Sequence, residues 1–245
     1  MNPVLLVASL LAAIFSHITL SAPPSGDWIL AFEDDFDSRV LDSEKWNVRS
    51  GPRRDAYWDG AGVIPHGNGL LEISTRVVNG KVVSGSIDTK TRFEQRFGYF
   101  EARCRLPKMP GHWSAFWLLS REFGSSDSAR RSGAEVDIFE YHALLGDTVH
   151  HAVHWPKYGP SLQSRKKRTP LVYDGQFHVF GLLWDKSKYV FYVDDNPVWE
   201  TTEGVSEVAH YLLLTNEVGP WAGKLEVTAL PDGMTCDYVR VYKHV

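Results

Sequence analysis

The 245-residue sequence lacks several features that would assign it to a common class of protein. It has no excess of positive charge: 26 Lys and Arg stand against 30 Asp and Glu, a net charge of −4, so the molecule is not built to bind nucleic acid. We find no repeat and no convincing amphipathic helix, which argues against repeat and helical folds. No stretch rich in Pro, Gly and Ser divides residues 23–245, so we expect one catalytic domain there.

Long apolar runs are also scarce, and the only marked one lies at the N-terminus. Val4 to Phe15 is nearly unbroken and is followed by small residues up to Ala22. This pattern is typical of a secretory signal peptide over residues 1–22, although no Lys or Arg precedes the run. The run is too short to span a bilayer comfortably. We therefore expect no stable membrane anchor and a secreted or periplasmic protein.

Cysteine is limited to Cys104 and Cys236. An exported protein can join two such residues in a disulfide. Side-chain alternation argues against it here, because Cys104 lies on the apolar face of its expected strand, whereas Cys236 opposes Val239 and Val241. Two separate thiols are the expectation, and the disulfide is the alternative.

Short strand-like runs separated by turns make up most of the remaining chain. The expected strands are Trp28–Phe32, Leu70–Val78, Lys81–Val83, Ser86–Arg92, Gly98–Leu106, His112–Leu119, Thr148–Trp155, Phe177–Trp184, Tyr189–Val193, Val198–Thr202, His210–Glu217 and Thr235–Lys243. Asn79-Gly80 is a strong hairpin signal. Residues 156–170 are expected to form a long loop. The regular spacing favours an all-β sandwich of two antiparallel sheets.

One further strand-like run, Glu135-Val136-Asp137-Ile138-Phe139-Glu140, carries three carboxylates among residues that favour a core. A carboxylate in a buried strand is costly unless it faces a cleft or has a partner. Glu135 and Asp137 share one face by alternation, and a β-bulge at Ile138-Phe139 would return Glu140 to it. The two Glu Cα atoms would then lie about 13 Å apart at ~3.3 Å per residue. Leaning side chains would bring the carboxyl groups to roughly 5–6 Å, near the separation in retaining glycosidases. The alternative is a surface strand with solvated acids.

Four segments in the right order resemble family 16 of the glycoside hydrolases. The acidic run resembles its E-x-D-x-x-E signature. The other three are Phe97–Arg103 with Leu106-Pro107, the Trp-bearing Gly111–Leu119, and the terminal Asp237–Tyr242. The resemblance covers roughly residues 28–245. It implies a concanavalin-like β-jelly roll with an open concave cleft, and retaining endo-hydrolysis of a β-linked polysaccharide.

The resemblance also implies a role for each acid. Glu135 would be the nucleophile, Glu140 the general acid/base, and Asp137 the residue between them, whose charge or shared proton keeps the glutamates in different protonation states. Cleavage would give a glycosyl–Glu135 ester, which water then hydrolyses or a sugar captures by transglycosylation. This chemistry needs no cofactor.

Candidate substrate-binding residues surround the acids. Trp113 and Trp117 share one strand face and are expected to line the cleft, with a place in the core as the alternative. His154 and Trp155 face opposite ways, so only one of them is expected to reach the sugar. The remaining candidates for this cleft are Arg92, Glu217 and Trp221.

A structural calcium ion occurs in some members of the family, between the N-terminal acidic segment and the last strand. By this resemblance Asp237 and residues 33–37 are candidate ligands, because calcium prefers oxygen ligands. Solvated acids are the alternative.

The sequence leaves the identity of the polysaccharide open. A β-1,3- or mixed-linkage β-1,3/1,4-glucan is the first expectation, although Ser114 stands where laminarinases often have Pro, and residues 121–132 lack a Pro-Trp pattern. The basic clusters Arg53-Arg54, Arg130-Arg131 and Arg165–Arg168 are expected in loops, where they would suit a sulfated galactan through charge-assisted bonds. Agar, porphyran and carrageenan are therefore alternative substrates. A non-catalytic sugar-binding jelly roll is another alternative, and a monomer is expected.

Overall fold

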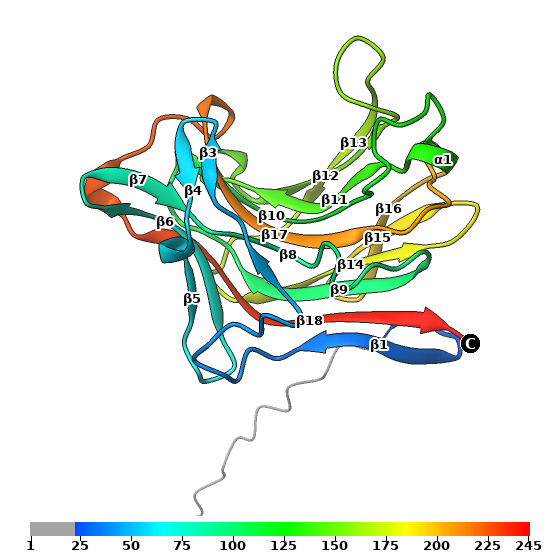
Figure 1. Cartoon of the computed structure of the whole chain (residues 1–245), viewed down its shortest axis with the longest axis horizontal. Helices are drawn as coiled ribbons and strands as arrows, with labels where there is room; N and C mark the ends of the chain where they lie inside the picture. Colours follow the sequence, from blue (N-terminus) through cyan, green and yellow to red (C-terminus); the bar gives the residue numbers. More distant parts are fainter. Residues whose placement is uncertain (1–22) are drawn as a thin grey trace, which may run out of the picture.

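Two β-sheets face each other across a shared hydrophobic core (Figure 1). The structure is a computed structural model, and it describes residues 23–245. The predicted signal peptide, residues 1–22, lies outside the described residues. Within the described range, no helix has the length and apolar character needed to cross a membrane.

The smaller sheet has seven strands in the order β13-β12-β11-β10-β17-β8-β2, and all of its neighbouring strands are antiparallel. Their bounds are β2 (Asn47–Val48), β8 (Ser86–Asp88), β10 (His112–Leu119), β11 (Glu135–Tyr141), β12 (Thr148–Trp155), β13 (Gln163–Pro170) and β17 (Tyr211–Val218). Consecutive strands β10, β11, β12 and β13 lie side by side, so the acidic strand β11 is in the interior of the sheet.

The larger sheet has eleven strands, with the main order β16-β15-β14-β9-β18-β6-β7-β4-β3, while β1 pairs with β18 and β5 pairs with β6. Their bounds are β1 (Trp28–Asp34), β3 (Gly51–Arg53), β4 (Ala56–Trp58), β5 (Val63–Pro65), β6 (Leu71–Val78), β7 (Lys81–Ser84), β9 (Gly98–Arg105), β14 (Phe177–Trp184), β15 (Tyr189–Val193), β16 (Asn196–Thr201) and β18 (Asp232–His244). The helical segments are η1 (Gly60–Gly62), α1 (Ala129–Ser132), η2 (Ala143–Leu145), η3 (Pro220–Ala222) and η4 (Val227–Ala229).

The core between the sheets follows from side-chain alternation. Val136, Ile138 and Phe139 of β11 are fully buried, and the ring centroid of Phe139 lies 4.1 Å from that of Phe180 in β14 of the opposite sheet. Burying a side chain of this size contributes about 1.5–3 kcal/mol. The predicted two-sheet sandwich is thus confirmed, and its packing leaves the other face of β11 free to carry polar groups.

The Asn79-Gly80 turn forms as the sequence predicts. Both residues have positive φ, 49° and 75°, as a two-residue hairpin turn of the I′ type requires. The turn joins β6 and β7, which pair directly on either side of it.

The predicted long loop at residues 156–170 is wrong in its second half. Gln163–Pro170 forms β13, which pairs with β12 along its whole length. The strand reads Gln-Ser-Arg-Lys-Lys-Arg-Thr-Pro and is mostly exposed, so it offers no apolar alternation to predict it from. It lies at the edge of the sheet, where charged side chains discourage pairing with other chains.

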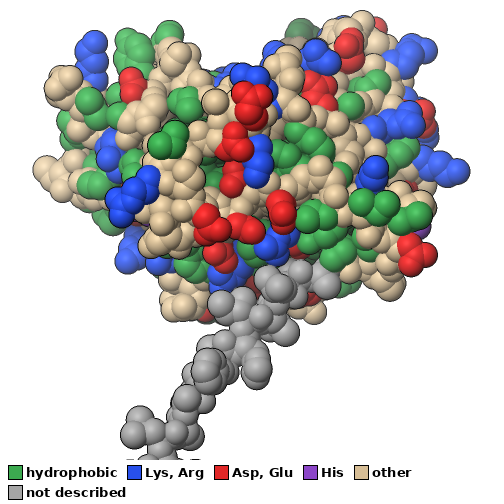
Figure 2. Space-filling view, turned by 60° about the horizontal axis from the view of Figure 1, so that its bottom comes forward, with side chains coloured by type: hydrophobic (Ala, Val, Ile, Leu, Met, Phe, Trp, Pro, Cys, Tyr) green, Lys and Arg blue, Asp and Glu red, His purple; other side chains and the backbone are tan. Residues whose placement is uncertain are grey.

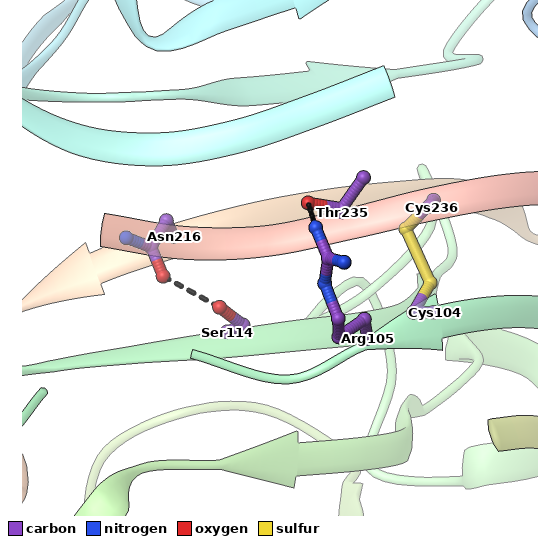
Figure 3. The surroundings of a disulfide bond; sticks show 6 residues. All are labelled: Cys104, Arg105, Ser114, Asn216, Thr235 and Cys236. Atoms are coloured by element: carbon purple, nitrogen blue, oxygen red, sulfur yellow. Dashed lines mark hydrogen bonds between the residues drawn. A yellow bond between two sulfur atoms is a disulfide. The ribbon is translucent and has the colours of Figure 1, made fainter. Parts of the chain in front are cut away.

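The prediction of two separate thiols is also wrong, because Cys104 of β9 and Cys236 of β18 form a disulfide (Figure 3). They are direct partners in the ladder, with Cα atoms 4.1 Å apart. Alternation fails here because the register shifts between Cys236 and Tyr238. This bulge reverses the faces, so Cys236 is buried on the same side as Val239.

Removing the disulfide should lower the stability markedly. The bond joins residues 132 positions apart, and closing a loop of that length restricts the unfolded chain, which corresponds to about 3–5 kcal/mol in the free energy of unfolding. The measurement is urea unfolding of the Cys104→Ala/Cys236→Ala protein beside the wild type. Equal midpoints would show that the bond does not stabilise the fold in solution.

Candidate active site

Three carboxylates of β11 line one pocket on the face of the seven-stranded sheet turned away from the core. The pairing of β11 with β12 shifts between Asp137 and Glu140, and the intervening Ile138 and Phe139 are both fully buried. This is the β-bulge predicted from the sequence, and it brings Glu140 to the same face as Glu135 and Asp137. The β3–β4 hairpin and the loop before β13 rise on opposite sides of this face (Figure 1).

The acids are crowded and partly withdrawn from water, which changes their ionisation. Burial and, to a smaller extent, the charge of Glu140 raise the pKa of Glu135 to about 7, although the hydrogen bond donated by the Tyr158 hydroxyl acts in the opposite direction. Burial, together with the charges of Glu140 and Glu135, raises the pKa of Asp137 well above its usual range. Burial therefore favours the protonated form of Asp137, and in that form it can donate a hydrogen bond to a neighbouring carboxylate.

Two histidines of β12 hold two of these acids in place. His154 Nε2 lies 3.5 Å from Asp137 Oδ2, and His154 Nδ1 lies 2.6 Å from Ser164 Oγ. His150 Nδ1 lies 3.0 Å from Glu140 Oε2. Burial lowers the pKa of His154 to about 4, so this imidazole is neutral at neutral pH and acts through hydrogen bonding.

The two tryptophans of β10 also line the pocket. Trp117 packs with Leu213 in a small apolar cluster outside the main core, and its Nε1 donates to Thr215 Oγ1 at 3.0 Å. Trp113 lies between Arg54, 5.1 Å from its ring centroid, and Trp221, whose ring centroid is 5.3 Å away. Neither indole belongs to the core between the sheets, so the alternative of core tryptophans is wrong.

An ion cluster, formed by the buried Glu217 and two partly exposed arginines, closes one side of the pocket. The Glu217 carboxylate accepts hydrogen bonds from Arg53 Nε at 2.9 Å and from Arg54 Nε at 3.1 Å. The sequence pointed to Arg53 and Arg54 only as a basic cluster for a sulfated substrate and did not point to Tyr158 or Thr215, yet all four line the pocket. The Arg53-Arg54 pair was a visible signal, but nothing in the sequence shows that β3 lies against the end of β17.

Three predicted contacts lie elsewhere or at the rim. Trp155 is in the core, because it follows His154 on β12 and faces the other side of the sheet. Arg92 hydrogen-bonds Asn47 at 3.4 Å in a turn after β8 and does not line the pocket. Trp221 is 39% exposed in η3, where it packs against Trp113 at the edge of the site.

Two of the carboxylates proposed as calcium ligands have guanidinium partners. Asp237 pairs with Arg103, and Asp35 pairs with Arg240 at 2.9 Å. Acidic and basic side chains lie next to one another on the side of the molecule that Figure 2 shows. A carboxylate already bound to a guanidinium group is a poor cation ligand. In this structure guanidinium groups hold both carboxylates, and the calcium site at Asp237 and residues 33–37 stays a prediction.

Ser114, which stands where laminarinases often have Pro, lies behind the pocket. Ser114 is fully buried, and its hydroxyl lies 2.7 Å from Asn216 Oδ1 (Figure 3). The side chains of its neighbours in β10, Trp113 and Ala115, line the pocket. The replacement of Pro at this position therefore does not alter the surface that a sugar would touch.

Comparisons with known proteins agree with this geometry. A sequence model described as glycosyl hydrolases family 16 matches residues 54–240. The chain is 28% identical to a β-glucanase of Rhodothermus marinus, over 89% of this chain and 86% of that protein. It is 33% identical to the endo-1,3-1,4-β-glycanase ExsH of Rhizobium meliloti (strain 1021), over 65% of this chain and only 33% of the longer relative.

A solved structure matches as well. The laminarinase catalytic domain of Thermotoga maritima MSB8 superposes with a TM-score of 0.78 and 27% sequence identity, covering 89% of this chain and 99% of that one. The family match spans the acidic strand β11 and both tryptophans of β10. The chain therefore belongs to family 16 of the glycosyl hydrolases and is an O-glycosyl hydrolase built on a two-sheet β-jelly roll.

Proposed function

We propose that this protein is a retaining endo-hydrolase of a β-1,3- or mixed-linkage β-1,3/1,4-glucan. The observation that carries the proposal is the pocket in which Glu135, Asp137 and Glu140 meet on one face of β11. The Rhodothermus relative is a β-glucanase and the Thermotoga neighbour is a laminarinase, which supports a β-glucan as the substrate.

Glu135 is the proposed nucleophile. The Tyr158 hydroxyl donates to its carboxylate, and the charges of Arg53 and Arg54 also lower its pKa, so these groups favour the ionised form. The carboxylate attacks the anomeric carbon, and the bond from that carbon to the leaving sugar oxygen breaks. The product of this step is a glycosyl–Glu135 ester.

Glu140 is the proposed general acid/base. In the first step it gives its proton to the leaving oxygen, and in the second it takes a proton from the water that attacks the ester. His150 bonds the Glu140 carboxyl group and fixes its orientation. Two inversions at the anomeric carbon return the β configuration, and capture of the ester by a sugar would give transglycosylation.

Asp137 and the indoles position the reacting groups. Burial raises the pKa of Asp137, which lies beside His154, so its protonated form is favoured and can donate to a neighbouring carboxylate as charge moves along β11. Trp113 and Trp117 offer apolar ring faces on which a pyranose can pack. Because Glu135 and Glu140 are spaced along one strand, a sugar between them belongs to a chain that crosses the strands of the sheet.

A reducing-sugar assay tests the function and the substrate together. Laminarin, lichenan, agarose, porphyran and carrageenan would each be incubated with the purified protein. We expect oligosaccharides from laminarin and lichenan. Cleavage of a galactan alone would replace the β-glucan proposal, and binding without cleavage would favour a non-catalytic sugar-binding protein.

Export is part of the proposal. A disulfide is stable in oxidising compartments and rare in the cytosol, and Cys104 and Cys236 form one here. Together with the predicted signal peptide at residues 1–22, this supports action on a polysaccharide outside the cytoplasm.

The pH profile should report the ionisation of Glu135. Because the nucleophile must be charged, kcat/KM should fall as the pH drops below about 7, the pKa to which burial raises Glu135. Tyr158→Phe removes a donor to the charged form, so this acid limb should move upward by up to about one pH unit. The measurement is kcat/KM on laminarin from pH 4 to 9.

The control for this profile is Tyr57→Phe, which alters a half-exposed tyrosine of β4 that does not line the pocket. An acid limb that stays in place in Tyr158→Phe would show that the Tyr158 hydroxyl does not tune the group that limits activity.

A further inference from the structure

The edge strand β13 continues the face that carries the catalytic acids. In the ladders, Asp137 of β11 is opposite Ala152 of β12, and Ala152 is opposite Lys166 of β13. Directly opposed residues point to the same side of a sheet, so Lys166 lies on the same face as Asp137, beyond the residues that line the pocket. The residue between them is only an alanine, and the positive charge of Lys166 acts on both Asp137 and His154.

A second row runs parallel to the first. Glu140 of β11 is opposite His150, and His150 is opposite Arg168. Arg168 therefore lies on the same face as Lys166, two residues further along the edge strand. Its charge acts on His142, at the end of the acidic strand. The hydrogen bond between His154 and Ser164 shows the same orientation of β13 in the neighbouring row.

These two cations are exposed and have no ion pair within the part of the chain that the structure describes. The other cations around the site do have carboxylate partners: Arg53 and Arg54 with Glu217, Lys157 with Asp127, and Arg165 with Glu203. Arg165 and Lys167 point to the opposite side of β13, because they alternate with Lys166 and Arg168. Among the described residues, three cations of β13 thus have no ion pair: Lys166 and Arg168 lie on the face that the substrate crosses, and Lys167 lies on the other face.

We propose that Lys166 and Arg168 form a subsite for an anionic substituent of the polysaccharide, such as a sulfate ester or a uronate carboxylate. The inference rests on the proposed function and names a substrate class for the same cleft. Strands lie ~4.8 Å apart, so β13 is about 10 Å from β11. A chain that crosses the strands therefore places there a sugar one or two residues from the cleaved bond. The Arg168 guanidinium suits two oxygens of an anion, and the Lys166 ammonium adds a point charge.

Two other roles would also give a basic edge strand. Charged side chains could simply protect the edge from pairing, or Lys166 could act only on the ionisation of Asp137. Edge protection does not depend on which face carries the charge, and an effect on Asp137 would change the hydrolysis of every substrate alike. Variants on the two faces of β13, each assayed on a charged and a neutral polymer, therefore distinguish a subsite from both of these roles.

The test compares laminarin with laminarin carrying a low degree of sulfation. Lys166→Glu and Lys167→Glu change the same charge at adjacent positions on opposite faces of β13, so each is the matched control of the other. We expect the ratio of kcat/KM for the sulfated polymer over the neutral one to fall at least tenfold in Lys166→Glu. It should change less than twofold in Lys167→Glu. Arg168→Ala should lower the ratio in the same direction as Lys166→Glu.

Equal ratios in the wild type and Lys166→Glu would overturn the subsite while leaving β-glucan hydrolysis intact. If the ratio fell equally in Lys167→Glu, the cause would be general electrostatic attraction and the subsite would be overturned. If Lys166→Glu shifted the pH profile and left the ratio unchanged, the role of Lys166 would be to act on the ionisation of Asp137, which would also overturn the subsite. If the wild type cleaves neither polymer, the proposed hydrolytic function fails, but the subsite can still be tested. In that case calorimetry measures the binding of sulfated laminarin oligosaccharides. A tenfold weaker affinity in Lys166→Glu supports the subsite, and an unchanged affinity overturns it.

Discussion

Glu135→Gln should lower kcat/KM on laminarin by about four to six orders of magnitude, the loss expected when a covalent nucleophile is removed. Gln has nearly the same shape, but it cannot form the ester, so the two-step path through a glycosyl–enzyme is closed. The charge that develops at the anomeric carbon also loses the carboxylate that faces it. The measurement is release of reducing ends with enough protein to detect a rate near the uncatalysed background.

Loss of activity must be separated from loss of folding. Burial raises the pKa of Glu135 from 4.5 to about 7, so folding favours its neutral form, and the wild type loses stability as the pH rises through that range. Gln stays neutral, so Glu135→Gln should be at least as stable as the wild type at pH 8 and similar at pH 4. Glu44→Gln, an exposed site outside the pocket, is the activity control. Residual activity above about one per cent in folded Glu135→Gln would contradict the assignment.

The configuration of a trapped product gives an independent check. In Glu135→Ala, azide can enter the space of the lost carboxylate and attack a β-glycosyl fluoride directly, releasing fluoride. One inversion then yields an α-glycosyl azide. A β-glycosyl azide from this variant would mean that another group still forms the covalent intermediate.

The acidic strand was predictable because its signal is local. Apolar and acidic residues alternate over Glu135–Asp137, and the break in alternation before Glu140 required a bulge if all three acids were to share a face. Burial of Ile138 and Phe139 is the physical cause of that bulge, since both side chains gain by entering the core. A bulge with such strong side-chain preferences can be inferred from the sequence.

The bulge in β18 could not be inferred in the same way. Its effect is to place Cys236 and Val239 on one side of the strand, although they are an odd number of residues apart. A simple alternation is equally consistent with the local sequence, so the faces were assigned in reverse. Only the pairing of β18 with β9, a contact between distant segments, places Cys236 opposite Cys104.

The residues that sequence reasoning missed come from segments without a strong hydrophobic pattern. Arg53 is on a strand of three residues, and Tyr158 is in the loop after β12, so neither has a periodic neighbour to orient it. β13 is held by backbone pairing to β12 at the edge of a sheet. Solvent on its outer side permits charged residues at nearly every position, which hides the strand from any hydrophobic criterion.

Glu140→Gln should separate the two chemical steps rather than abolish both. On laminarin we expect a fall of about a thousandfold, because an unprotonated sugar alkoxide is a poor leaving group and general acid catalysis contributes typically 10²–10⁴. On a β-glucoside of 2,4-dinitrophenol the leaving group needs no proton, so ester formation on Glu135 should continue. Hydrolysis of the ester then lacks its base, and the glycosyl–enzyme should accumulate to a level that mass spectrometry of the intact protein can detect.

Azide makes this outcome decisive. It needs no general base, so it should attack the accumulated ester of Glu140→Gln, raise turnover of the dinitrophenyl glucoside and yield a β-glycosyl azide after two inversions. The same anion should give the α product with Glu135→Ala, and the opposite configurations distinguish nucleophile from acid/base without any structural assumption. If Glu140→Gln instead loses activity equally on laminarin and on the dinitrophenyl glucoside, and azide restores neither activity, then Glu140 only supports the structure of the pocket. The neighbouring carboxyl of Asp137, whose pKa burial raises, would then be the candidate for the proton donor.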